Sequence, residues 1–200
     1  MKARIGSEQW EWLRRDLLAV DRLRTPWVVF GGHRPGYIDS NHASKNYNGN
    51  GDLEVMALWI KHVEPLLIAA KVDFAVWGHN HAVQRLCASR GGLCIERSSV
   101  EDGVHVYHLP PATVHLVVGV GGASFTKNDV GADFTEKVFH KWGFAHVIAH
   151  NRTHLDWRFL DNGANDDSLS SPGRVLDAAR IIRQDHAAIF SVIFNNKDRL

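Results

Sequence analysis

The chain has 200 residues, a hydrophobic fraction of 44% and a formal net charge of +1 at pH 7. This length suits one domain or most of a larger one, and the apolar fraction is enough for a core. A near-neutral charge without a run of Lys or Arg argues against a nucleic-acid-binding surface. No apolar stretch reaches the ~20 residues that span a bilayer, and the opening segment MKARIGSEQW lacks the apolar region of a signal peptide. We therefore expect a chain that binds neither nucleic acid nor a membrane.

A helix followed by a strand is predicted at the start of the chain. Segment 6–23 carries apolar residues at helical spacing from Trp10 to Val20, and Ser7 is placed to cap its amino end. Segment 26–32, PWVVFGG, is a short apolar run rich in β-branched and aromatic residues and closed by glycine. This pattern predicts a buried strand.

The next stretch predicts a loop, a helix and a second strand. Asn, Ser, Gly and Asp dominate segment 36–52, which indicates a long loop. Segment 53–71 is helical with a break near Pro65, and segment 73–78, DFAVWG, again predicts a buried strand. Strand, loop, helix and strand in this order are typical of an α/β fold, which places its chemistry in the loops at the carboxyl ends of the strands.

The second half of the chain predicts antiparallel strands beside the α/β part. It has few helical signals and five short strand-like runs, at 103–109, 112–120, 144–150, 154–160 and 174–182. A polar turn segment precedes the last of these runs. The residues after it fit neither a strand nor a capped helix.

Two histidines follow the second predicted strand, in the loop GHNH. His79 and His81 lie two residues apart, so in an extended segment they face the same side and can converge on closely spaced metal ions. His33 occupies the matching place after the first predicted strand, and adjacent parallel strands would bring the two loops together. The sequence therefore predicts that His33, His79 and His81 bind metal. The alternative is a set of loop histidines without a metal.

His42 and two aspartates are further candidates. His42 could donate a hydrogen bond to an anionic substrate from the long loop, although a surface histidine without a ligand is the simpler interpretation. Asp39 is a candidate carboxylate, whereas Asp73 precedes its strand, at the end far from the histidines, and is interpreted as structural. Asp52, in NGNGDL, does not follow a buried strand as a metal-binding block does, so it is not predicted as a ligand.

These segments carry a resemblance to a known family. GSEQWEWLRRDLLAVDR, PWVVFGGHRP and KVDFAVWGHNH resemble the second half of a purple acid phosphatase, in the binuclear metallophosphoesterase superfamily. ATVHLVVGVGGASF and FAHVIAHNRTHLDWRFLDN resemble its C-terminal segment. The resemblance implies an α/β fold, the second half of a metallophosphoesterase α/β/β/α sandwich followed by antiparallel strands. It assigns 1–110 to the C-terminal half of the catalytic domain, 111–184 to the C-terminal segment and 185–200 to an irregular tail.

The resemblance also implies a binuclear centre of Fe(III) with Zn(II), Mn(II) or Fe(II). His33 matches the histidine of the family motif V-x-x-H, and His79 and His81 match the two histidines of G-H-x-H. His33 and His79 would bind the divalent ion, His81 would bind the ferric ion, and His42 falls in the loop that holds a substrate-contacting histidine. At such a centre a metal-activated hydroxide hydrolyses phosphate monoesters, while histidines help to protonate the leaving group.

We assign none of the family's three other metal-binding blocks, D-x-G, G-D-x-x-Y and G-N-H-[DE], to a segment of this chain. The sequence is therefore expected to be a fragment of an acid phosphatase, inactive by itself, whose partner is the missing N-terminal half or a full-length homologue. Two alternatives stay open: a catalytically inactive metal-binding remnant, and a metallophosphoesterase that acts on phosphodiesters or nucleotides. No oligomeric state is predicted.

Cys87 and Cys94 are the only two cysteines. Gly91 and Gly92 lie between them, so a hairpin could bring their Cα atoms within the ~4.4–6.8 Å that a disulfide needs, while two free thiols are the alternative. The family carries a similar pair, which favours the disulfide. Asn151 begins the glycosylation sequon NRT. The resemblance implies a secreted or vacuolar/lysosomal glycoprotein.

Overall fold

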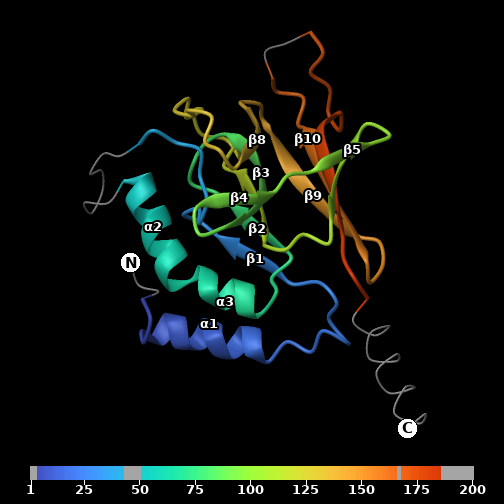
Figure 1. Ribbon diagram of the computed structural model, residues 1–200. Helices are drawn as coiled ribbons and strands as arrows, with labels where there is room; N and C mark the ends of the chain where they lie inside the picture. The colour runs from blue at the N-terminus through green and yellow to red at the C-terminus, as the bar shows by residue number, and fades with distance from the viewer. Residues whose placement is uncertain (1–3, 43–50, 166–167, 186–200) are drawn as a thin grey trace, which may run out of the picture.

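The computed structural model describes residues 4–42, 51–165 and 168–185, which form three layers (Figure 1). The first layer contains the helices α1 (Glu8–Leu18), α2 (Asp52–His62) and α3 (Glu64–Ala69). The second is a sheet of β1 (Val29–Gly32), β2 (Phe74–Trp77), β3 (Val83–Arg90), β4 (Leu93–Glu96), β7 (Val114–Val118) and β8 (Thr135–Phe139). The third is a sheet of β5 (Ser99–Glu101), β6 (Val104–His108), β9 (Gly143–Ala149), β10 (His154–Asp161) and β11 (Val175–Ile182). None of the described helices has the length and apolar character needed to cross a membrane.

The helices begin and break where the sequence predicts. The Ser7 side chain caps α1 by accepting a hydrogen bond from the backbone N–H of Trp10 at 3.3 Å. The buried face of α1 carries Leu13 and Leu17, as the helical spacing indicates, although the helix ends at Leu18 rather than near residue 23. The predicted break near Pro65 is confirmed, because α2 ends before it and α3 has this proline in its first turn.

Three parallel strands form the part of the first sheet that positions the histidines. β2 pairs in parallel with β1 on one edge and with β7 on the other. The predicted buried strand at 73–78 is confirmed as β2. The expectation for β1 is wrong in part: Val29 is 48% exposed, because β1 is an outer strand of the sheet as described. The segment 112–120 was expected among the antiparallel strands, but its β7 lies in this first sheet, parallel to β2.

The second sheet has the strand order β5-β6-β11-β10-β9. Its pairs are antiparallel, as predicted, except that β6 and β11 run parallel. The proposed boundary between residues 110 and 111 does not separate the sheets. β6 precedes this boundary and pairs with β11, whereas β7 follows it and pairs with β2. The boundary itself stays a prediction from the resemblance.

Alternate residues of β2 pack against the two neighbouring layers. Ala75 and Trp77 lie in a core cluster with Trp59 of α2, and Phe74 lies in a second cluster with Trp157 of β10. All of these side chains are at most 5% exposed. Burying a large apolar side chain contributes roughly 1.5–3 kcal/mol, so both faces of the strand hold it in place. The loops at its ends are therefore carried by a rigid element.

The hairpin from β3 to β4 carries the disulfide that the sequence suggested. Cys87 and Cys94 are bonded, with their Cα atoms 5.8 Å apart. Gly91 and Gly92 turn the hairpin with φ angles of 61° and 83°, in the left-handed region that favours glycine. The segment of the predicted long loop that the structure describes is more buried than its polar composition indicates, because Tyr37 is fully buried. Most of the predicted tail, residues 186–200, lies outside the described residues.

Candidate functional site

Two paired parallel strands bring His33 and His79 together. Gly32 at the end of β1 is in register with Trp77 at the end of β2, so the loops that follow begin side by side. The ring centroids of His33 and His79 are 5.3 Å apart, with the planes inclined at 76°. The backbone N–H of Gly78 donates to the carbonyl of His33 at 3.2 Å and fixes this approach. The convergence predicted from the two loops is thus present for this pair.

His79 is held by the carboxylate of Asp52. Its Nε2 lies 3.0 Å from Oδ1 of Asp52, and Arg34 places Nη2 3.2 Å from the same oxygen. The Ser40 hydroxyl donates to the second carboxylate oxygen at 3.0 Å. Burial alone would raise the pKa of Asp52, but the hydrogen bonds from His79 and Ser40 and the charges of His79 and Arg34 hold it below its ordinary value. Asp52 is therefore an anion that orients His79.

This contact decides which nitrogen of His79 is available. In a neutral ring, the carboxylate favours the proton on Nε2 and leaves the lone pair on Nδ1. The backbone of His79 has a φ of 65°, a conformation that costs a residue other than glycine about 1–2 kcal/mol. A strained histidine held by a buried carboxylate is typical of a functional position rather than of a surface loop.

Sequence reasoning did not find Asp52. The signal for a helix start was present, since Gly51 and Asp52 precede a helical pattern and acidic residues favour the first turn. The contact with His79 is between residues 27 positions apart and depends on where α2 lies against the sheet. The sequence analysis therefore placed Asp52 at the end of the predicted long loop and not in the site.

His81 is held by a different segment, the loop that follows β7. Its Nδ1 lies 2.6 Å from the carbonyl oxygen of Ser124, which can only accept, so the proton belongs on Nδ1 and the lone pair on Nε2. The backbone N–H of Thr126 donates to the His81 carbonyl at 3.1 Å. Gly119 lies against the carbonyl of Asn80 with no space for a Cβ atom. Within the described ranges, no ring contact or ion pair joins His81 to His33 or His79.

The structure also shows the surroundings of the other three candidates, His42, Asp39 and Asp73. His42 has its backbone beside Asp52, whose N–H donates to the His42 carbonyl at 3.0 Å. Asp39 is fully buried and accepts a hydrogen bond from the N–H of Val130 at 2.8 Å, so it holds the loop after β7. Asp73 lies at the other end of β2, where it was expected, and accepts from the N–H of Val28.

The available donors fit one side of a metal centre but not a complete one. In the part of the chain that the structure describes, no group of three or more His, Cys, Asp and Glu side chains is arranged to hold a metal ion. Three neutral imidazoles leave the charge of two metal ions uncompensated, and Asp52 already binds His79, Arg34 and Ser40. Any binuclear centre would need further anionic ligands.

Comparison with known proteins shows which family the chain resembles. The family model for the iron/zinc purple acid phosphatase-like protein C domain matches residues 112–171, the part that contains β7 to β10. A probable purple acid phosphatase 20 from Arabidopsis thaliana is 39% identical over 82% of this chain. The chain is similar to purple acid phosphatases. It matches the C-terminal part of these proteins, as the sequence resemblance implied.

Two further matches define the extent of this likeness. A probable inactive purple acid phosphatase 9 from Arabidopsis thaliana is 36% identical over 58% of the chain. A purple acid phosphatase isolated from yellow lupin (Lupinus luteus) seeds superposes with a TM-score of 0.72 at 25% identity and covers 94% of the chain. The chain spans 34% and 15% of the two Arabidopsis proteins and 30% of the lupin chain. The mixed α/β fold with two sheets is thus the fold of this family.

Members of the family are hydrolases with a binuclear metal centre, and some relatives of this chain are named as probable inactive proteins. In this chain, the histidine pair at the ends of β1 and β2 is the group of residues whose geometry suits such a centre. Whether the chain takes part in such hydrolysis therefore depends on these histidines and on the further ligands that would complete a metal centre.

Proposed function

We propose that this chain supplies His33, His79 and His81 to the binuclear centre of an acid phosphatase that hydrolyses phosphate monoesters. The observation that carries the proposal is the 5.3 Å approach of the His33 and His79 rings at the carboxyl ends of two paired parallel strands. In this proposal, anionic ligands from an N-terminal half, in the same polypeptide or in a full-length homologue, complete the centre. The ions would be Fe(III) with Zn(II), Mn(II) or Fe(II).

Each histidine has a distinct part in the proposed reaction. His33 and His79 hold the divalent ion, His79 through the Nδ1 that its contact with Asp52 leaves available. His81 holds the ferric ion through Nε2, because its Nδ1 bonds to Ser124. Such a centre supplies Lewis acidity and a water of lowered pKa. His42, whose backbone is tied to Asp52, donates a hydrogen bond to the phosphate or to the leaving oxygen.

A second candidate is an inactive protein that still binds a transition metal. It is supported by the Asp52 ion pair, which satisfies His79 with groups of the chain alone, and by relatives that are named as probable inactive purple acid phosphatases. A third candidate keeps the reaction type and changes the substrate to a phosphodiester or a nucleotide. The two hydrolase candidates differ only in substrate, so metal binding and the turnover of two model substrates separate all three.

The test uses two proteins. One is the 200-residue chain alone, and the other is a chimera in which this chain replaces the matching C-terminal part of the Arabidopsis purple acid phosphatase 20. With iron and zinc at pH 5, the chain alone should hydrolyse p-nitrophenyl phosphate no faster than its His79→Ala, His81→Ala control. The chimera should bind two metal ions per molecule and hydrolyse the ester, and His33→Ala, His79→Ala or His81→Ala should each reduce kcat/KM at least about 100-fold.

The outcomes separate the candidates. A folded chimera that binds metal without turnover would support the inactive protein. Faster hydrolysis of bis(p-nitrophenyl) phosphate than of the monoester would support the diesterase. Metal-dependent turnover by the chain alone would show that the ligand requirement is wrong, since no further anionic ligand is then needed.

A secreted or vacuolar glycoprotein is part of the proposal. The Cys87–Cys94 disulfide suits an oxidising compartment, and Asn151 of the sequon is exposed. Its side-chain oxygen accepts hydrogen bonds from the N–H groups of Thr153 and His154, within a tight turn. Expression through a eukaryotic secretory pathway should add one glycan, which Asn151→Gln should remove, as measured by mass spectrometry.

A further inference from the structure

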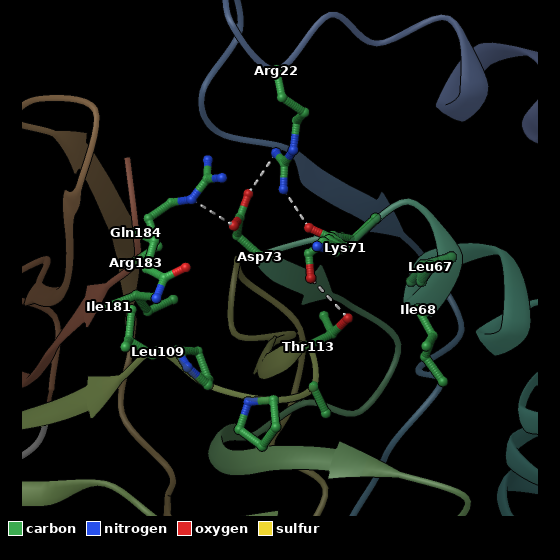
Figure 2. Close-up of a pocket in the computed structure, with 14 residues that line it drawn as sticks. Arg22, Leu67, Ile68, Lys71, Asp73, Leu109, Thr113, Ile181, Arg183 and Gln184 are labelled. Carbon is green, nitrogen blue, oxygen red and sulfur yellow. Dashed lines mark hydrogen bonds and ion pairs between the residues drawn. The ribbon is translucent and has the colours of Figure 1, made fainter. Parts of the chain in front are cut away.

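A pocket of about 500 Å³ lies at the amino ends of β2 and β7, the end of the first sheet opposite to the histidines (Figure 2). Its walls come from α3, the turn before β2, the linker between β6 and β7, and the end of β11. A volume of this size suits a small organic ligand. The pocket is therefore large enough for such a ligand, and the side chains that line it indicate the chemical class of the ligand.

The polar part of the lining has an excess of positive charge. Arg22, Lys71 and Arg183 line the pocket together with the single acidic residue Asp73. Figure 2 shows the Asp73 carboxylate between the two guanidinium groups. Arg22 places Nη1 2.8 Å from one oxygen of Asp73, and Arg183 places Nε 3.4 Å from the other. One carboxylate thus pairs with two guanidinium groups. The three cationic residues and one acidic residue of the lining leave a net charge of +2.

Both arginines retain buried hydrogen-bond donors. Nη1 of Arg183 and Nε of Arg22 are buried and have no partner among the described residues. Arg183 is only 8% exposed, and its guanidinium lies over the Trp27 ring at 5.3 Å from the centroid. Burial lowers the pKa of Arg183, with the charge of Arg22 acting in the same direction and Asp73 opposing it. The two donors are closed off from solvent, so the guanidinium charges are incompletely hydrated and would attract an anion in the pocket more strongly than exposed charges do.

The other walls of the pocket are apolar. Leu67 and Ile181 are at most 1% exposed, and Leu109, Pro110 and Pro111 form the linker side. Leu109 is 50% exposed and has a φ of 50°, so a strained apolar residue lies at the rim. Apolar walls beside a few charged donors are the usual composition of a site for an amphipathic small molecule.

We propose that this pocket binds a small organic anion, with a carboxylate or phosphate group at the arginines and an apolar body against Leu67, Leu109 and Ile181. Carboxylate and phosphate groups both pair with guanidinium and ammonium groups, so the two head groups share one recognition chemistry. The site is separate from the proposed phosphatase centre, because β2 runs between the two. Binding there does not require any of the histidines.

The test is a calorimetric titration of the 200-residue chain in EDTA with three probes of one shape: 1-naphthoate, 1-naphthylphosphonate and the neutral 1-naphthamide. At least one of the two anions should bind with an affinity tenfold or more above that of the amide, at one site per chain. The ratio of the carboxylate and phosphonate affinities then assigns the head group. The His33→Ala, His79→Ala variant should bind with unchanged affinity, which separates this site from the proposed metal centre.

A pair of matched variants tests the place of binding without disturbing the buried arginines. Leu109→Asp puts a negative charge at the rim, and Leu109→Asn is its neutral counterpart of equal size; Asn and Asp both tolerate the positive φ of this position. Leu109→Asp should weaken anion binding about three- to tenfold relative to Leu109→Asn and should leave the naphthamide affinity unchanged. Lys71→Gln should weaken anion binding two- to fivefold, and Lys71→Arg should restore it.

Three results would overturn the proposal: equal affinities for the anions and the amide, no binding of either anion at millimolar concentration, or equal anion affinities of the Leu109→Asp and Leu109→Asn variants. The fold of each variant is checked by circular dichroism and thermal unfolding. Because Leu109 is half-exposed, neither of its variants should unfold the chain.

Discussion

The two ends of strand β2 each have one largely buried carboxylate that binds cationic side chains, but its role differs between the ends. At the amino end, Asp73 binds Arg22, Arg183 and the backbone N–H of Val28, and so joins three segments of the chain. At the carboxyl end, Asp52 binds His79 and Arg34, whose side chains stay 30% and 32% exposed. One carboxylate mainly joins the fold together, whereas the other orients groups that solvent and ligands can still reach.

The largest expected effect is a difference in stability between the two ends. Asp73→Asn should lower the free energy of unfolding by about 3 kcal/mol, because it leaves two largely buried guanidinium groups without their counter-charge. Asp52→Asn should cost only about 1 kcal/mol, since its partners are part-exposed and can be hydrated. Urea unfolding of both variants and the wild type measures the difference. Equal losses of unfolding free energy would mean that the two carboxylates contribute equally to stability.

The middle of the sheet should lose stability in mildly acidic solution. His115 of β7 is fully buried, lies nearly parallel to the Trp77 ring with an interplanar angle of 7°, and accepts a hydrogen bond from its indole N–H at 3.1 Å. Burial lowers the pKa of His115 to about 3, whereas an unfolded histidine has about 6.5. Below pH 6.5 the unfolded chain therefore binds a proton that the folded chain does not. The free energy of unfolding therefore decreases by about 1.4 kcal/mol for each unit by which the pH is lowered, until the pKa of the folded state is reached.

Between pH 6.5 and pH 5 this group alone should remove about 2 kcal/mol of stability. His115→Gln keeps an acceptor for Trp77 and removes the titration, so its stability should decline less over that range. Urea unfolding at several pH values compares the two slopes. Parallel slopes for the wild type and His115→Gln would show that His115 also takes up its proton in the folded state.

A smaller effect is expected for metal binding at the carboxyl end. The chain alone should bind Zn(II) weakly, and Asp52→Asn should weaken that binding about tenfold, because the carboxylate no longer orients His79. Competition with a chromophoric chelator measures the affinity. Glu8→Gln, at an exposed position in the first turn of α1, changes the charge equally and should have no effect. Tighter binding by Asp52→Asn would show that Asp52 competes with the metal for His79.

The smallest effect concerns the strained rim of the pocket at the amino end. Leu109→Gly should raise the free energy of unfolding by about 0.5–1 kcal/mol, because glycine adopts a φ of 50° without a steric cost. Leu93→Gly is the matched control, since Leu93 is also exposed but lies in β4 without a positive φ. That change should lower stability by about 0.5–1 kcal/mol. Loss of stability in both variants would show that apolar contacts of Leu109 outweigh its backbone strain.

Local patterns in the sequence determined the elements that depend on neighbouring residues. The Ser7 cap, the break at Pro65 and the hairpin that joins Cys87 to Cys94 each need only a short stretch of chain. The approach of His33 to His79 could also be predicted, because two apolar runs followed by histidines imply parallel strands that end together. In each case the local energy preference and the final structure agree.

Only the tertiary structure decided which distant segments meet. The sequence places β7 near strands of the second half, yet it pairs with β2, since sheet partners are chosen by long-range packing that periodicity does not encode. The bond from Asp52 to His79 and the arrangement of Arg22 and Arg183 around Asp73 arise in the same way. The sequence thus determined which strands the candidate functional side chains follow. Their partners were decided by the packing of helices and sheets, because a carboxylate binds whichever cation the fold brings within about 3 Å.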